Sequence, residues 1–149
     1  MTNRFERYLE GDIVEIPLPD GRTALGWILH ISQHFKDAVG FIIFGIKGQV
    51  REDAVFHGGS EVPSSMPVLG PLYTHRDALK HYGWRVFAHQ PVSEPKRQLT
   101  RRLVGGGVYV GDDYLGRVEE LGEMGLKPML AMGMPVIYNE IEKAFGKAS

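Results

Sequence analysis

The chain of 149 residues contains no cysteine, which excludes disulfide bonds and thiolate metal sites. A cysteine-free chain suits a reducing compartment. Long apolar runs are also missing, since the longest, near residues 39–46, is far too short to span a bilayer. The first seven residues are polar and lack the apolar segment of a signal peptide. We therefore expect a cytoplasmic protein that makes no membrane contact.

The sequence also lacks a strong charge of one sign. Its formal net charge is −1, so no global field attracts it to nucleic acid or to a membrane surface. The charges are nevertheless unevenly placed along the chain. A short basic run consists of Lys96, Arg97, Arg101 and Arg102. An acidic stretch follows it, interrupted by a single arginine, and consists of Asp112, Asp113, Glu119, Glu120 and Glu123.

The first half of the chain has the patterns of β-strands. Residues 12–18 and 23–32 are apolar segments on either side of Pro19-Asp20-Gly21, a strong turn signal, which predicts a hairpin. Residues 39–46 are continuously apolar, as in a strand that is buried on both faces. Glycines in these strands indicate bulges or close backbone crossings, as in a small curved barrel, and they are Gly26, Gly40 and Gly45.

Further strands are expected over residues 68–73, 84–89 and 108–110. In the second of these, Trp84, Val86 and Ala88 alternate with Arg85, Phe87 and His89, which predicts that Trp84 lies in the core. Residues 93–100 are polar and contain a proline, so a loop is expected there. Residues 115–124 fit either a helix or a strand.

Two helices have clear signals. Thr74 is placed to cap a short helix over residues 75–82, which Gly83 ends. A second helix is expected to begin at Pro135. One face of this helix is apolar and consists of Ile137, Ile141, Ala144 and Phe145. These patterns predict a single α+β domain over residues 1–149, with a curved, barrel-like antiparallel sheet and two or three helices.

The candidate catalytic and metal-binding residues form no complete set. His30 and His34 have the spacing of a helical zinc site, but they lie at the end of a predicted strand and have no third ligand nearby in sequence. His57 and Ser60 lack the G-x-S-x-G elbow of a nucleophilic serine. The glycines at 105–107 lack the lysine of a Walker A loop and lead into a strand. We therefore predict no catalytic residues, no metal and no cofactor.

Two blocks of sequence carry a resemblance to a known family. The first block is GDIVEIPLPDGR at residues 11–22, followed by GWIL at 26–29. The second block is LGPLY at 69–73, followed by DAL at 77–79 and WRV at 84–86. Together they resemble the immunity protein 26 family, over residues 9–110.

The resemblance implies a bacterial immunity protein of a polymorphic-toxin or contact-dependent inhibition system. Such a protein binds one cognate toxin domain and blocks it, and it needs neither catalytic residues nor a cofactor. If the toxin is a nuclease, its cleft must be basic, and an acidic patch would mimic the substrate and speed association. With Tyr114 as an aromatic anchor, the predicted partner-binding residues are Asp112, Asp113, Tyr114, Glu119, Glu120 and Glu123.

Other interpretations stay open at this point. The same acidic stretch would also occur on an ordinary solvated face. A small barrel that binds nucleic acid through Lys96, Arg97, Arg101 and Arg102 is the main alternative. That basic run contains no aromatic residue on which a base could stack, which disfavours nucleic acid as the partner. A small-molecule hydrolase is a third class, and the sequence presents no catalytic set for it.

Overall fold

The computed structural model describes residues 8–33, 35, 38–48, 69–122 and 125–147. The strands are β1 (Asp12–Pro17), β2 (Thr23–Ile31), β3 (Ala38–Ile46), β4 (Leu69–His75), β5 (Arg85–His89), β6 (Arg102–Val104), β7 (Gly107–Val110) and β8 (Asp113–Arg117). The helices are α2 (Arg76–His81), α3 (Glu94–Arg97), the 3₁₀ helix η2 (Gln98–Thr100), α4 (Val118–Leu121) and α5 (Met134–Phe145).

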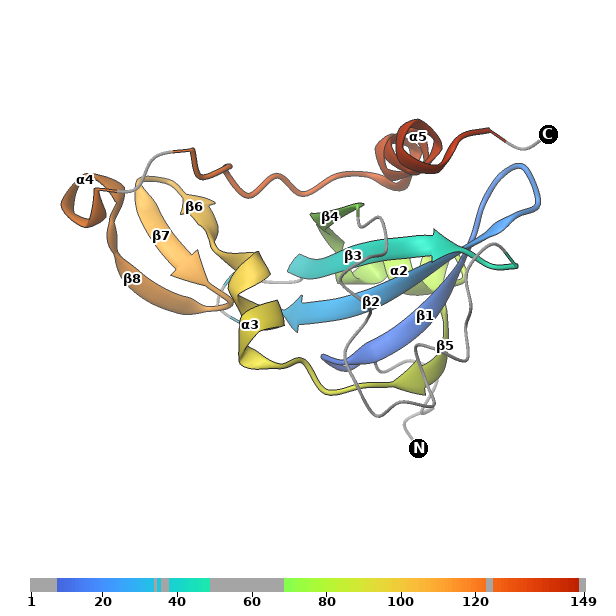
Figure 1. The fold of residues 1–149 in the computed structure, drawn as a ribbon, viewed down its shortest axis with the longest axis horizontal. Coiled ribbons are helices and arrows are strands. Elements are labelled where there is room, and N and C mark those ends of the chain that lie inside the picture. Colours follow the sequence, from blue (N-terminus) through green and yellow to red (C-terminus); the bar gives the residue numbers. More distant parts are fainter. Residues whose placement is uncertain (1–7, 34, 36–37, 49–68, 123–124, 148–149) are drawn as a thin grey trace.

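The strands form two antiparallel sheets of different size (Figure 1). The larger sheet has the order β4-β3-β2-β1-β5, and the smaller has the order β6-β7-β8. The predicted α+β class is therefore confirmed, with α3 and α4 as additional helices of about one turn. Among the described residues β4 and β5 do not pair with each other, so the larger sheet is open and is not a closed barrel.

The first three strands are joined as the sequence predicts. Gly21 has a φ of 90° in the turn between β1 and β2, a left-handed conformation that favours glycine. The Leu18 N–H donates to the Arg22 carbonyl at 2.8 Å and closes the hairpin. Every residue of β3 is buried. This confirms that β3 is covered on both of its faces.

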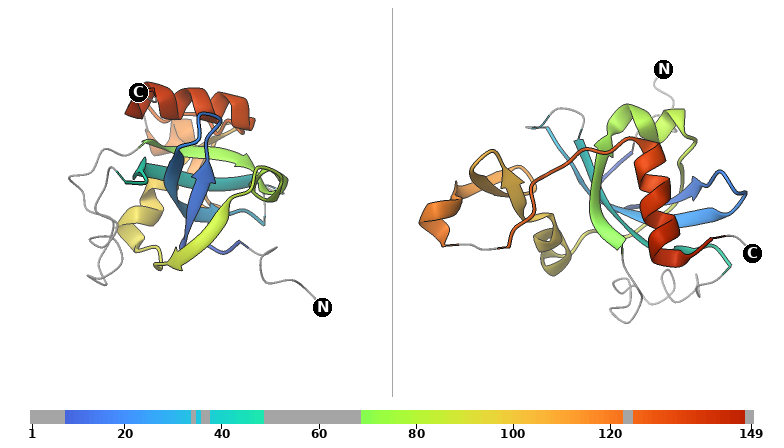
Figure 2. Two further views of the ribbon diagram at one scale, coloured as in Figure 1. Left: turned by 90° about the vertical axis from the view of Figure 1, so that its right-hand side faces the viewer. Right: turned by 90° about the horizontal axis from the view of Figure 1, so that it is seen from above.

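Two apolar clusters lie on the two faces of the larger sheet. On one face, residues of β1, β2 and β3 pack against Leu79 of α2 and against α5, which lies across the sheet (Figure 2). The buried residues of α5 are Met134, Ile137 and Ile141, whereas Ala144 is exposed, so its predicted place on the buried face is wrong. On the opposite face, Trp27 and other alternate residues of β2 and β3 form the second cluster.

A bulge in the outer pair of the larger sheet changes the expected alternation of β5. Strand β1 pairs Ile13 with Ala88 and Val14 with Val86, so Phe87 has no opposite residue. Trp84 is 4% exposed, as predicted, but Val86 is 40% exposed, and the shared face predicted for them is wrong. The extra residue shifts the side-chain pattern of the strand by one position.

Gly40 is one of the glycines expected at a close crossing. A shift in register between Ile28 and His30 lies directly opposite it, where β2 has an extra residue. A Cβ atom at Gly40 would lie 2.7 Å from Cε1 of Tyr73 on β4. The absence of a side chain at Gly40 therefore lets the Tyr73 ring lie against β3.

Two other local predictions are wrong. Thr74 does not cap α2, because it lies in β4 and its hydroxyl donates to the Met132 carbonyl at 2.8 Å. His75 precedes α2 instead, without a side-chain capping bond. The expected loop at 93–100 contains α3 and η2, since Pro95 lies in the first turn of α3, where a missing N–H costs nothing.

The segment 115–124, which fitted either a helix or a strand, contains the end of β8 and the whole of α4 in its described part. Residues 102–121, from β6 to α4, are called the arm, and Figure 1 shows the arm extending beyond one end of the larger sheet. From the arm the chain returns alongside β6, where the Met129 N–H donates to the Leu103 carbonyl at 2.8 Å. It then runs beside β4, where the Met132 N–H donates to the Tyr73 carbonyl at 2.7 Å, and enters α5.

Candidate functional site

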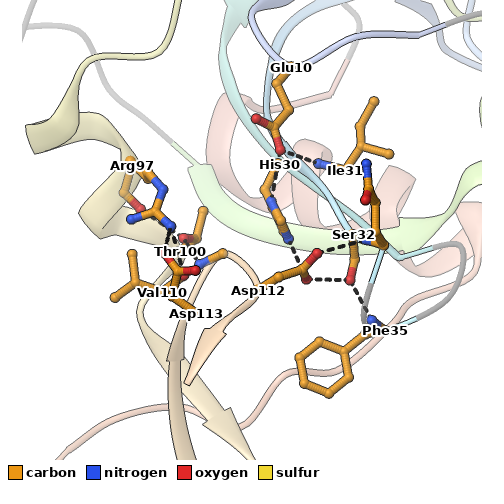
Figure 3. Close-up of polar contacts among 12 residues, drawn as sticks. Glu10, His30, Ile31, Ser32, Phe35, Arg97, Thr100, Val110, Asp112 and Asp113 are labelled. Atoms are coloured by element: carbon orange, nitrogen blue, oxygen red, sulfur yellow. Dashed lines mark hydrogen bonds and ion pairs between the residues drawn. The ribbon is translucent and has the colours of Figure 1, made fainter. Parts of the chain in front are cut away.

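A group of polar side chains lies where the arm meets the end of β2 (Figure 3). Asp112, in the turn between β7 and β8, is at its centre. Its Oδ1 accepts a hydrogen bond from the Ser32 hydroxyl at 2.6 Å, and its Oδ2 accepts one from the Gln33 N–H at 2.7 Å. The same Oδ1 lies 3.0 Å from Nε2 of His30. A single carboxylate therefore joins the arm to the end of β2.

His30 lies between two carboxylates. Its Nδ1 is 2.9 Å from Oε1 of Glu10, its Nε2 contacts Asp112, and its side chain is only 10% exposed. The hydrogen bond with His30 lowers the pKa of Glu10, and the Ile31 N–H and the charge of Arg97 act in the same direction against the effect of burial. The group is thus held together by charge as well as by geometry.

The contacts of Ser32 differ from those of a nucleophilic serine. Its hydroxyl donates to Asp112 and accepts a hydrogen bond from the Phe35 N–H at 2.6 Å. In a catalytic triad the serine contacts the histidine, and the carboxylate lies behind the histidine. Here the carboxylate stands between Ser32 and His30. The described part of the chain also contains no group of three or more histidine and carboxylate side chains that could hold a metal ion.

The other side of the β7–β8 turn is held by basic and hydroxyl side chains. Arg97 of α3 donates to the Val110 carbonyl at 3.1 Å and to the carboxylate of Asp113. The Thr100 hydroxyl accepts a hydrogen bond from the Gly111 N–H at 2.8 Å. Arg102 donates from Nη1 to the Gly111 carbonyl at 2.7 Å. The turn is therefore fixed from α3, η2 and β6 as well as from β2.

Arg102 is buried, although it belongs to the basic run. It is 3% exposed, and its guanidinium lies 5.0 Å from the ring centre of Tyr73 and 5.6 Å from that of Phe35. Burial lowers the pKa of Arg102. Because Arg97 is bound to Asp113 and Arg102 is enclosed, the four residues of the basic run do not form one exposed face.

The outer surface of the arm combines apolar and acidic side chains. Tyr114 is 56% exposed, Leu115 is 42% exposed and Leu121 is 39% exposed. Asp113, Glu119 and Glu120 are exposed beside them in the same strand and the next helix. The Tyr114 ring lies 5.3 Å from that of Tyr109 and covers Gly107, where a Cβ atom would lie 2.9 Å from it. The Tyr114 ring is thus exposed to solvent while it packs against Tyr109 and Gly107.

The structure divides the predicted acidic set. Asp112 belongs to the junction and contacts β2, whereas Asp113, Tyr114, Glu119 and Glu120 lie on the outer part of the arm. Glu123 lies outside the described residues, as do three other candidates of the sequence analysis, His34, His57 and Ser60. Glu10 and Ser32 were not predicted as site residues. Ser32 contacts Asp112, 80 residues away in sequence, and Glu10 contacts His30, 20 residues away, and no local spacing signals either contact.

Comparison of the chain with protein-family models, with curated proteins and with solved structures found no match in any of the three. Among the described helices, none has the length and apolar character needed to cross a membrane.

Proposed function

We propose that this chain is a cytoplasmic binding protein that neutralises a cognate bacterial toxin domain by covering its active site, with the outer surface of the arm as the contact. The observation that carries this proposal is the exposure of three large apolar side chains on the arm, Tyr114, Leu115 and Leu121, close in sequence to exposed carboxylates. The family resemblance of residues 9–110 supports the class of partner.

This surface has the composition of a protein-binding site. Binding energy at interfaces concentrates on a few large side chains, often tyrosine, that become fully desolvated. Polar and charged residues at the rim mostly set the association rate and its dependence on salt. Tyr114 fits the first role, and Glu119 and Glu120, both exposed on α4, fit the second. A complex of ordinary size would bury about 800 Å² on each partner.

The carboxylates of the arm can exchange their present arginine partners for basic groups of a binding partner. Asp113 pairs with Arg97, and Glu119 lies 3.3 Å from Arg117, with more than 60% of each acidic side chain exposed. Exposed ion pairs of this kind contribute about 0–1 kcal/mol. A basic cleft of a toxin could therefore replace them at low cost. The carboxylate of Asp112 is already bound to β2, so we do not include it in the contact surface.

The test is surface plasmon resonance with the toxin domain encoded beside the gene for this chain. We expect Tyr114→Ala to weaken binding by at least 2 kcal/mol, about 30-fold, through faster dissociation. We expect Glu119→Gln with Glu120→Gln to slow association, with a loss that shrinks as salt rises. The matched control is Tyr82→Ala, which removes another exposed tyrosine, next to α2 and away from the arm.

Two outcomes would contradict the proposal. If the arm variants and the control bind equally well, the acidic and apolar surface of the arm is only a solvated face. If the unaltered chain does not bind the neighbouring toxin domain, toxin neutralisation itself is wrong. Among the described basic residues, the burial of Arg102 and the pairing of Arg97 give the nucleic-acid alternative less support.

A further inference from the structure

In the described part of the chain, the arm is attached to the larger sheet without sharing a hydrogen-bonded ladder with it. Among the described residues, strands β6, β7 and β8 pair only with one another and with the returning segment beside Leu103. The chain enters the arm through α3 and η2 and leaves it through the segment that runs beside β4. Two further links are the side chain of Arg102, which lies against the rings of Tyr73 and Phe35, and the β7–β8 turn, which contacts the end of β2. The direction of the arm therefore depends in part on how this turn is held.

Asp112 provides the link between this turn and β2. All of its hydrogen bonds described above go to residues 30–33, and both carboxylate oxygens are used. Two separated acceptor atoms fix a group in position and in rotation, whereas one contact would leave it free to pivot. Hydrogen bonds to a charged acceptor are also stronger than those between neutral groups.

The neighbouring acidic residue has a different role. Asp113 contacts Arg97 of α3, and its side chain is 68% exposed, compared with 26% for Asp112. Asp112 and Asp113 are thus two adjacent carboxylates in one turn, of which one reaches the larger sheet. They form a natural pair of test and control positions.

The partners of Asp112 are themselves held in place. Glu10, which precedes β1, contacts the other ring nitrogen of His30 and accepts the Ile31 N–H at 3.1 Å. The Phe35 N–H donates to the Ser32 hydroxyl, which orients that hydroxyl towards Asp112. His30 and Ser32 are therefore held in a fixed arrangement in which they can bind the Asp112 carboxylate.

We propose that Asp112 is a positioning residue, which fixes the direction of the arm relative to the larger sheet through its contacts with His30, Ser32 and Gln33. The arm then presents Tyr114 and its neighbours in one orientation. That last consequence rests on the proposed function, whereas the positioning itself does not. A surface held ready in its bound orientation loses less entropy on binding.

The absence of cysteine makes this proposal directly measurable, because two introduced cysteines can be spin-labelled without background. One label replaces Glu120 on α4 of the arm, and the other replaces Lys143, whose side chain on α5 is 75% exposed. Pulsed electron paramagnetic resonance then gives the distribution of distances between arm and body. A second pair, Asp77→Cys on α2 with Lys143→Cys, reports on the body alone.

We expect a narrow distribution for the arm–body pair in the otherwise unaltered chain and in Asp113→Ala. In Asp112→Ala the distribution should broaden or shift, while the pair within the body stays unchanged. Asp112→Asn keeps one acceptor oxygen but loses the charge, so its effect should be intermediate. An unchanged arm–body distribution in Asp112→Ala and Asp112→Asn would overturn the proposal. Broadening of the body pair in both variants would also overturn it, since Asp112 would then maintain the fold as a whole.

The measurement needs no toxin, so the two proposals fail separately. If Asp112→Asn frees the arm, we expect it to weaken toxin binding about tenfold, because the arm must then be ordered on binding. A freed arm with unchanged binding would place the toxin contact elsewhere and leave the positioning role intact. If the arm stays fixed in the Asp112 variants while Tyr114→Ala loses toxin binding, the proposed function is supported and the positioning role is refuted.

Discussion

The Trp84 side chain stabilises the core through its ring, while its indole N–H, unpaired among the described residues, lowers the free energy of unfolding. Its ring meets that of Phe41 edge to face with the ring centres 4.9 Å apart, and its carbonyl accepts a hydrogen bond from the Tyr8 hydroxyl at 2.7 Å. The indole N–H is buried, however, and has no hydrogen-bond partner among the described residues. An unpaired buried donor costs about 1–3 kcal/mol. The position therefore requires an aromatic ring and gains nothing from the indole nitrogen.

Substitutions at Trp84 should separate these two contributions. We expect Trp84→Ala to lower the free energy of unfolding by about 3–5 kcal/mol, because it leaves a large cavity. Trp84→Phe should cost much less, since it keeps a ring against Phe41 and removes the unpaired donor. Urea denaturation measures both free energies if the slope with denaturant is unchanged. Equal losses in the two variants would mean that the indole nitrogen has a partner in solution.

Glu10 makes stability depend on pH in a defined direction. Because the hydrogen bond with His30 lowers its pKa in the folded chain, its ionised form stabilises the fold above the unfolded pKa, about 4.3. This contribution is lost as the pH falls through the folded pKa. We expect Glu10→Gln to be less stable than the unaltered chain by about 0.2–1 kcal/mol at pH 7, a modest amount because the side chain is half exposed. The difference should shrink as the pH falls through the folded pKa, and a difference of constant size in urea denaturation from neutral into acidic pH would contradict this account.

At the level of strands, the contact between β3 and β4 depends on the lack of a side chain at one position. Gly40→Ala would place a Cβ atom against the Tyr73 ring, and we expect a loss of about 1–3 kcal/mol in the free energy of unfolding from overpacking. Gly106→Ala, in the β6–β7 turn, meets no atom of the described residues within 4 Å and should change stability by less than about 0.5 kcal/mol. Thermal denaturation of the two variants provides the comparison. A tolerated alanine at Gly40 would show that Tyr73 can move away.

The elements that the sequence predicted well are those with a local cause. The turn at Pro19-Asp20-Gly21 defined the first hairpin, and the unbroken apolar run at 39–46 defined β3. The prediction that Thr74 caps α2 was wrong. A threonine followed by polar residues resembles a helix cap, but the Thr74 hydroxyl donates to the carbonyl of Met132, 58 residues away. Residues 93–100 are polar enough for a loop and still form α3 and η2, because Arg97 and Thr100 bond to the β7–β8 turn.

The contacts within the candidate site could not be predicted from the sequence. The acidic stretch was visible as a charge pattern, but nothing local separates Asp112, which is bound to β2, from Asp113, which faces outwards. His30 and Asp112 are 82 residues apart and belong to different sheets. The spacing of His30 and His34 suggested a metal site, which we rejected from the sequence without identifying another role for His30. Only the fold shows that His30 contacts two carboxylates.

Considered as a whole, the molecule joins two parts that are stabilised differently. The larger sheet is covered by apolar side chains on both faces, and most of its strand residues are buried. The arm buries Val108 and Val110, but all of β8 is exposed or partly exposed, and polar side chains fix the arm at its turn. A large apolar core provides a rigid base, and a polar junction provides a defined direction. This arrangement allows the outer surface of the arm to vary in sequence without disturbing the core.

The pairing of β1 with β5 has a consequence for synthesis on the ribosome. Strand β1 meets β2 soon after it is made, but its other edge waits for β5, and Asp12 pairs with His89, 77 positions later. Until then a nascent chain carries the first hairpins with an open, apolar strand edge, which is a template for association with other chains. Closing so long a loop is also entropically costly and slow. Pairing with β5 covers this edge of β1, so the emergence of β5 from the ribosome ends the exposure of the β1 edge.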